Sequence, residues 1–143
     1  MQLPYLLLVA LAASTPTLAL PASSISMTAS TPQWTIKSFR RVCNAAEASC
    51  AYSYSIDTHV SPIRACSYTI TGNTASRASY GNIKCGGYTV SSSWSGQFGQ
   101  GKGFQTLAMT NGRVIVYPAY TDKQLVGGKV VSPDQSYQPQ NLP

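Results

Sequence analysis

The stretch "SIDTHVSP" contains the only histidine of the chain, His59, two residues after Asp57. An acid, an imidazole and nearby hydroxyl groups are the components of a serine hydrolase. Such an enzyme also needs a nucleophile on a sharp turn, but no G-x-S-x-G occurs, and Ser95 in "WSGQFG" lacks that pattern. The stretch is therefore expected to end a strand, with Ile56 as its last inward residue and Pro62 preventing further pairing. One aspartate and one histidine are also too few ligands for a metal.

The acidic residues are the next candidates for chemistry, and there are only four: Glu47, Asp57, Asp122 and Asp134. A glycosidase needs two carboxyl groups facing each other across a sugar. Asp122 and Asp134 flank the last expected strand and could form such a pair. Their ordinary roles are an acid at a helix N-terminus for Asp122 and a turn residue for Asp134. Glu47 is expected to be solvated in a short loop. We therefore expect no catalytic residue and no enzyme activity.

Cofactor motifs are also absent from the sequence. The segment "GQFGQGKGF" is rich in glycine, but it lacks the G-K-[ST] ending of a phosphate-binding loop and a following helix. Its interest lies in the side chains that surround it, which we take as a candidate recognition surface. Exposed aromatic rings there could stack on sugars or dock a protein partner, whereas buried rings would close the end of a barrel. This candidate surface consists of Trp94, Phe98, Lys102 and Phe104.

The four cysteines are Cys43, Cys50, Cys66 and Cys85. An even number in a small exported domain indicates two disulfides, for which three pairings are possible. A hairpin of "WTIKSFRRVC" and "CAYSYSID" would place Cys43 opposite Cys50. Pairing of "CSYTIT" with the strand ending "NIKC" would place Cys66 opposite Cys85, within reach of a disulfide. We therefore expect Cys43–Cys50 and Cys66–Cys85. No C-x-x-C occurs, so neither a metal site nor a redox site is expected.

The chain carries a formal charge of +6, from 10 basic and 4 acidic residues. A basic secreted protein accumulates on anionic surfaces such as cell-wall polysaccharide. The basic residues are scattered between Lys37 and Lys129, and only Arg40 and Arg41 are adjacent. This distribution does not indicate a specific nucleic-acid site.

The first residues indicate export. "YLLLVALAA" is an apolar run too short to span a membrane, and Thr17 and Ala19 supply the small residues of a cleavage site. We expect a signal peptide over 1–19 and a flexible lead-in over 20–33. No later segment has the length of a membrane span, so no transmembrane segment is expected. The domain itself should cover 34–137, followed by a loose polar tail over 138–143.

The elements that position these residues should be strands, because the dominant period is two. Inward positions alternate with polar ones in "CAYSYSID", "ACSYTIT" and "GGYTVSSSW", and less cleanly in "WTIKSF". No helical stripe of useful length follows the signal. The prediction is an all-β fold, a small antiparallel β-barrel or sandwich of about six to eight strands with two disulfides.

Turn-forming residues predict which elements follow one another in the second half of the domain. Asn111-Gly112 predicts a two-residue type I′ hairpin that places Met109 opposite Val114. "TDKQL" should form one helical turn with Thr121 as its N-cap. "LVGGKVVSPD" is expected to be the last strand, with an irregularity at the two glycines.

A family resemblance rests on several long segments of the chain. They are "WTIKSFRRVCNAAEASCAYSYSID", "ACSYTITG", "RASYGNIKCGGYTVSSSWSGQFG" and "YPAYTDKQLVGGKVVSPDQSY". Together they cover most of Trp34 to Tyr137, and the chain resembles the hypersensitive-response-inducing elicitor proteins of plant-associated fungi. The resemblance implies a compact β-barrel with two disulfides, secretion into the plant apoplast and the triggering of plant defence. It supplies no catalytic residues.

The first functional hypothesis is therefore a non-enzymatic fungal elicitor or effector that acts through surface recognition. Its partner would be a plant cell-surface receptor or a cell-wall polysaccharide, and the protein is expected to be a monomer without a cofactor. The alternative is a carbohydrate-binding or antimicrobial protein of the fungal surface, which the positive charge and the loop aromatics would suit.

Overall fold

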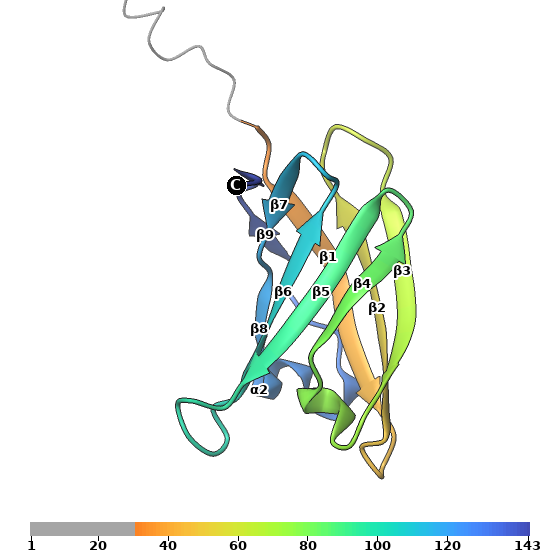
Figure 1. The fold of residues 1–143 in the computed structure, drawn as a ribbon, viewed down its shortest axis with the longest axis vertical. Helices are drawn as coiled ribbons and strands as arrows, with labels where there is room; N and C mark the ends of the chain where they lie inside the picture. The colour runs from red at the N-terminus through yellow and green to blue at the C-terminus, as the bar shows by residue number, and fades with distance from the viewer. Residues whose placement is uncertain (1–30) are drawn as a thin grey trace, which may run out of the picture. The chain divides into compact units, whose positions relative to one another are not determined.

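The computed structural model describes residues 31–143, and the predicted signal peptide, together with most of the lead-in, lies outside the described residues. The described chain is almost entirely β-structure, arranged as two antiparallel sheets (Figure 1). This confirms the all-β prediction and selects the sandwich, because the two sheets do not close into a barrel. None of the helices within residues 31–143 is long and apolar enough to cross a membrane.

The sheets contain four and six strands. The four-stranded sheet has the order β3-β2-β1-β9, and the six-stranded sheet has the order β10-β7-β6-β5-β4, with β8 also paired to β6. The four-stranded sheet consists of β1 (Trp34–Cys43), β2 (Ser49–Asp57), β3 (Arg64–Thr71) and β9 (Gln135–Tyr137). The six-stranded sheet consists of β4 (Tyr80–Cys85), β5 (Tyr88–Ser95), β6 (Phe104–Thr110), β7 (Val114–Val116), β8 (Ala119–Thr121) and β10 (Gln140–Asn141). Three short helical turns connect them: η1 (Ala75–Arg77), α2 (Asp122–Leu125) and η2 (Val126–Gly128).

A bulge in β1 explains the imperfect alternation of "WTIKSF". The pairing with β2 shifts between Lys37 and Arg40, and Ser38 has a φ of 54°. An extra residue in one strand changes which face the following side chains occupy. Ile36 is therefore buried before the bulge and Phe39 after it. The Asp134 carboxylate accepts the Ser38 N–H at 2.8 Å, which satisfies the donor that the bulge leaves unpaired.

The core between the sheets is rich in aromatic rings. Phe39 stacks on Tyr54 with ring centroids 5.2 Å apart, and on Tyr120 with centroids 4.1 Å apart. The hydroxyl of Tyr68 lies 3.0 Å from the hydroxyls of both Tyr54 and Tyr80. A row of hydroxyl groups therefore crosses the interior, and each of these three is hydrogen-bonded, as buried polar groups generally are.

The two disulfides have different positions in the fold. Cys43–Cys50 closes the β1–β2 hairpin, where the two residues are directly opposed. Cys66–Cys85 joins β3 to β4, the terminal strands of different sheets. The expected hairpin between these two strands is wrong, because β3 pairs with β2 and places Cys66 opposite Tyr54. The second disulfide is therefore a covalent link between the two layers.

Removing the link between the layers should destabilise the protein more than removing the hairpin disulfide. Loop-entropy arguments give about 3 kcal/mol for Cys66–Cys85 and about 2 kcal/mol for Cys43–Cys50, since their sequence separations are 19 and 7. Guanidinium unfolding of the two double-alanine variants, each keeping the other disulfide, measures the difference. Equal losses, or a larger loss for the hairpin pair, would contradict the entropic explanation.

The β6–β7 connection differs from the predicted type I′ turn. Met109 pairs with Val116 rather than with Val114, so the loop is two residues longer than expected. The side-chain oxygen of Asn111 accepts the N–H groups of Arg113 and Val114 at 2.9 and 3.0 Å. The Asn111 side chain thus bonds to the backbone of the residues that follow it, and this local hydrogen bonding replaces the predicted two-residue turn.

The end of the chain also departs from the expectation. "LVGGKVVSPD" does not form the last strand, because Gly127 and Gly128 have positive φ values of 69° and 72° and build the turn η2. The closing strands come later, where β9 pairs with β1 and β10 pairs with β7. Residues 138–143, expected to be a loose tail, therefore contain a strand of the six-stranded sheet.

Candidate recognition site

Two aromatic rings stack where the loop between β5 and β6 enters β6, one exposed on the loop and one half-buried at the start of the strand. Phe98 is 63% exposed and stacks on Phe104 with ring centroids 5.7 Å apart. Both rings line an apolar groove of about 280 Å³ whose other walls come from β8 and α2, including Tyr120 and Gln124. The loop extends from the end of the six-stranded sheet, next to α2 (Figure 1). We call Phe98, Phe104 and this hollow the aromatic groove.

The α2 wall of the groove is fixed by a helix cap. Thr121 accepts the N–H of Gln124 through its side chain, and the Gln124 side chain accepts the Thr121 N–H in return. This reciprocal capping box satisfies donors that a helix start leaves free. It confirms the predicted helical turn and its cap. Leu125 is buried and anchors the turn on the core.

Trp94, predicted to belong to the recognition surface, also contacts the residues that support the loop. Its indole N–H donates to the Asp122 carboxylate at 2.8 Å, and the Arg77 guanidinium lies 4.7 Å from the ring centroid. Gly96 and Gly103 pass so close that an added Cβ would lie 2.6 and 2.5 Å from the ring. The tryptophan therefore packs against the base of the loop, and its side chain is half-buried.

The other three residues predicted for the recognition surface lie at two places on or beside the same loop. Phe98 and Phe104 come together in the aromatic groove, and Lys102 lies exposed on the same loop. Hydrogen bonds from Gly99 to Gly96 and from Lys102 to Gly99 shape this loop locally. The candidate surface of the sequence analysis is thus one groove with a nearby cation, and Trp94 lies beside it as a support.

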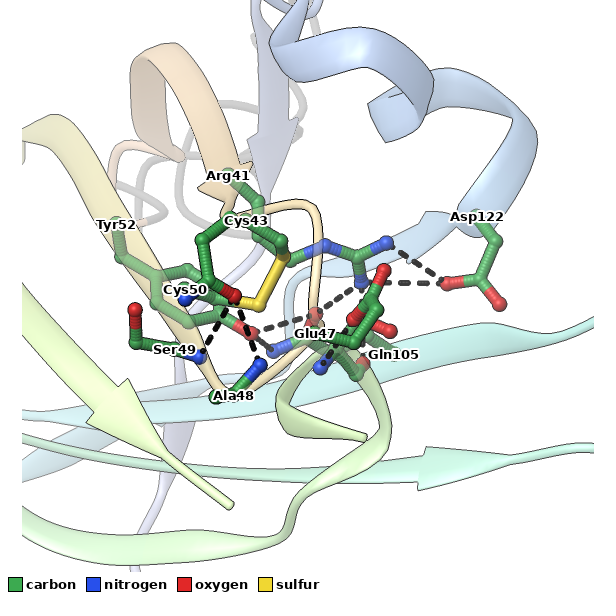
Figure 2. The surroundings of a disulfide bond; sticks show 11 residues. Arg41, Cys43, Glu47, Ala48, Ser49, Cys50, Tyr52, Gln105 and Asp122 are labelled. Carbon is green, nitrogen blue, oxygen red and sulfur yellow. Dashed lines mark hydrogen bonds and ion pairs between the residues drawn. A yellow bond between two sulfur atoms is a disulfide. The ribbon is translucent and has the colours of Figure 1, made fainter. Parts of the chain in front are cut away.

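A buried polar network extends from Asp122 through the interior, and Figure 2 shows its central part. Asp122 accepts two hydrogen bonds from the Arg41 guanidinium, both at 3.2 Å. Arg41 also donates to the side-chain oxygen of Gln105 at 3.1 Å. The Gln105 amide group donates to the Tyr52 hydroxyl at 3.0 Å and to the Ser92 hydroxyl at 2.7 Å. One chain of contacts therefore connects both sheets with α2.

A polar pocket of about 410 Å³ opens beside this network, next to the Cys43–Cys50 disulfide. Its walls come from the β1–β2 hairpin, η1 and the α2–η2 segment. Glu47 has a φ of 55°, and its carboxylate accepts the N–H of Ser76 at 3.3 Å. The residues that line this polar pocket are Arg41, Val42, Cys43, Glu47, Ser76, Arg77, Asp122, Leu125, Val126, Gly127 and Gly128.

Sequence reasoning missed the polar pocket, although part of a signal was present. Alternation after the bulge puts Arg41 on the same face as Phe39, and alternation in β6 puts Gln105 on the face of Leu107. A polar residue in an inward position predicts a buried partner. Glu47 was expected to be merely solvated, and nothing in its neighbouring residues points to η1.

The histidine motif is a hydrogen-bonded cluster on an exposed surface. His59 Nδ1 lies 3.6 Å from the Asp57 carboxylate, and His59 Nε2 lies 2.8 Å from the Thr35 hydroxyl. Thr35 in turn contacts the Ser136 hydroxyl at 2.8 Å. The Asp57 carboxylate also accepts the His59 N–H at 2.9 Å, which shapes the bend after β2. The strand end predicted here is confirmed, and the aromatic groove and polar pocket lie elsewhere.

Asp122 and Asp134, considered as a catalytic pair, are engaged by different partners. Asp122 lies in the first turn of α2 and bonds to Arg41 and Trp94. Asp134 accepts the backbone N–H of Ser38 in the β1 bulge. Asp122 therefore has the helix N-terminal position predicted for it, whereas Asp134 bonds to the distant β1 bulge rather than to its own turn.

These features together define a small disulfide-linked β-sandwich with an exposed aromatic groove and a polar pocket at one end. Residues 35–142 match the family described as Effector TSP1. The chain belongs to this family of fungal effectors, which confirms the resemblance drawn from the sequence. A similar curated protein is Effector TSP1 of Hypocrea virens (strain Gv29-8 / FGSC 10586), 50% identical over 135 residues that cover 92% of each chain.

Proposed function

We propose that this effector is secreted into the plant apoplast, where it elicits defence and cell death by binding a cell-surface receptor, without catalysing a reaction. Membership of the effector family supports the general role. The observation that carries the proposal is the Phe98 ring, 63% exposed and stacked over an apolar groove on a rigid scaffold. Exposed aromatic residues of this kind dominate the binding energy of many protein interfaces.

The chemistry of the groove describes the receptor surface that would fit. An apolar hollow of about 280 Å³ suits a large aliphatic or aromatic side chain. Lys102 on the loop and Lys123 on α2 are exposed and adjoin the groove in sequence. Cations beside an apolar anchor attract a partner that carries acidic residues, and they accelerate its association. The receptor segment is therefore an apolar side chain flanked by carboxylates.

Infiltrating plant leaves with purified Phe98→Ala tests the proposal. A central aromatic contact is worth about 2 kcal/mol or more, so the dose that gives half-maximal defence-gene induction should rise by roughly 30-fold. The matched control is Val60→Ala, which removes a 71% exposed apolar side chain from another loop and should leave the dose unchanged. Circular dichroism of both variants verifies that they are folded.

Two results would overturn this proposal. One is a wild-type protein that causes neither cell death nor defence-gene induction at micromolar dose. The other is Phe98→Ala with full activity, which would move recognition away from the aromatic groove. Lys102→Gln adds a second readout, because a lost steering charge should weaken the response more at low ionic strength than at high ionic strength.

A further inference from the structure

The polar pocket beside the Cys43–Cys50 disulfide has no part in the receptor contact proposed above. We propose that it binds a neutral sugar, the end of an oligosaccharide chain. Its volume of about 410 Å³ falls in the range of small-molecule sites. The proposal goes beyond the effector role and does not depend on the aromatic groove.

The charges in the pocket select the chemistry of the ligand. Its walls carry two guanidinium groups, Arg41 and Arg77, and two carboxyl groups, Glu47 and Asp122. Guanidinium groups only donate hydrogen bonds and carboxylates only accept them. A ligand that meets both kinds of group therefore needs donors and acceptors together, and each sugar hydroxyl supplies both. The two carboxylates balance the two guanidinium groups, so the side chains of the pocket give no net positive charge that would select a phosphate or carboxylate ligand.

The pocket also has an apolar part, as a sugar site should have. Val42, Leu125 and Val126 line it together with the backbone of Gly127 and Gly128. Val126 is 62% exposed, so its surface remains available for contact. The C–H groups of a sugar ring can pack on such a wall while the hydroxyl groups bond to the polar wall.

The three segments that form the pocket are held in place before any ligand arrives. Arg41 is 7% exposed, and its guanidinium also donates to the Ser76 carbonyl at 3.3 Å, which ties β1 to η1. The Ala75 N–H donates to the Glu47 carbonyl at 2.7 Å, which docks the disulfide loop on η1. The Arg40 guanidinium donates to the Gly128 carbonyl at 2.6 Å, which fixes η2. Rigid walls reduce the ordering cost of binding.

A nuclear magnetic resonance titration of the mature protein with cellotetraose and laminaritetraose tests the proposal. At least one of the two should shift the backbone amide signals of Ser76, Arg77 and Gly127 in a saturable manner. Glu47→Gln and Arg77→Gln each remove a charged hydrogen-bonding group, so each should weaken the affinity by about tenfold. The control is Lys84→Gln, which changes an exposed cation on β4 and should bind like the wild type.

The outcomes separate this proposal from its rivals. The absence of shifts with both tetrasaccharides overturns it, as does a response centred on the loop of Phe98. If glycylglycine binds as tightly as the tetrasaccharides or more tightly, the pocket is a zwitterion site and the proposal is overturned. If galacturonate does so, the pocket is an anion site and the proposal is overturned as well. Phe98→Ala should bind the sugar normally, so failure of the receptor proposal and failure of the sugar proposal are distinguishable.

Discussion

The protein is expected to unfold cooperatively as the pH rises above 10, with its interior tyrosines ionising together in the same transition. Burial raises the pKa of Tyr54 to about 12 and raises the pKa of Tyr52 as well. Burial, reinforced by neighbouring phenols, also raises the pKa of Tyr68, Tyr80 and Tyr120 well above the ordinary value. These groups therefore stay protonated in the folded protein at a pH where unfolded tyrosine ionises.

The sign and size of the effect follow from proton linkage. Each tyrosine has a higher pKa in the folded state, so its contribution is fully present below pH 10 and declines as the pH rises towards the folded pKa. Each one lowers the unfolding free energy by about 1.4 kcal/mol per pH unit in that window. Five such groups give a slope of roughly 7 kcal/mol per pH unit as an upper bound. A domain of ordinary stability loses its fold within one or two pH units on such a slope.

Absorbance at 295 nm and circular dichroism, followed through the same alkaline titration, test this prediction. The ionisation of the interior phenols and the loss of structure should share one midpoint. Tyr68→Phe removes one of the ionising groups, so the unfolding free energy should fall less steeply with pH above pH 10, whereas Tyr117→Phe, at a 47% exposed position, should leave the slope unchanged. Complete phenol ionisation in a protein that keeps its native circular dichroism spectrum would refute the prediction.

Replacement of Arg41 with methionine is expected to lower the unfolding free energy by about 3 kcal/mol. The guanidinium is 7% exposed and bonds to Asp122, Gln105 and the carbonyl of Ser76. Methionine keeps much of the volume but removes the donor of the Ser76 carbonyl and of Asp122 Oδ1, although Asp122 Oδ2 keeps the Trp94 N–H and Gln105 keeps the Tyr52 hydroxyl. A buried acceptor that loses its donor carries a desolvation penalty. Because the Asp122 side chain is 32% exposed, water can solvate it in part, which keeps the loss at the lower end for a buried pair.

Guanidinium unfolding of Arg41→Met, Asp122→Asn and the double variant measures the contact directly. The double variant should lose less than the sum of the two single losses, because both remove the same interaction. Arg113→Met is the matched control at an exposed loop position, and it should change the unfolding free energy by less than about 0.5 kcal/mol. A loss of that small size for Arg41→Met would show that the network does not stabilise the fold.

Strands with one apolar face could be predicted from the sequence, because alternation survives wherever pairing is regular. It located β2 and β3, and it weakened in β1 where the Ser38 bulge changes the phase. Prediction failed where side chains bond to the backbone, as Asn111 does in the β6–β7 loop. It also failed for β9 and β10, whose few polar residues acquire strand structure only from the partners they meet.

In the candidate site, too, features that depend on residues close in sequence could be predicted, whereas features that depend on contacts between distant segments could not. The aromatic groove was accessible to sequence reasoning, since Phe98 and Phe104 are only six residues apart in the chain. The role of Trp94 depends on Asp122, 28 residues away, and on Arg77 from the opposite direction in the chain. The polar pocket assembles three distant segments. Only the folded arrangement of the two sheets brings such groups together.

The Cys66–Cys85 link has a further consequence for resistance to proteases. Terminal strands of a sheet have one neighbour each, so β3 and β4 belong, with β9 and β10, to the strands that thermal motion detaches most easily. Proteases cleave segments that have detached in this manner, since a paired strand does not fit their active sites. The disulfide ties β3 to β4, so neither of these two strands can detach without carrying its counterpart. Digestion that begins at this edge of the oxidised protein therefore requires both sheets to open together.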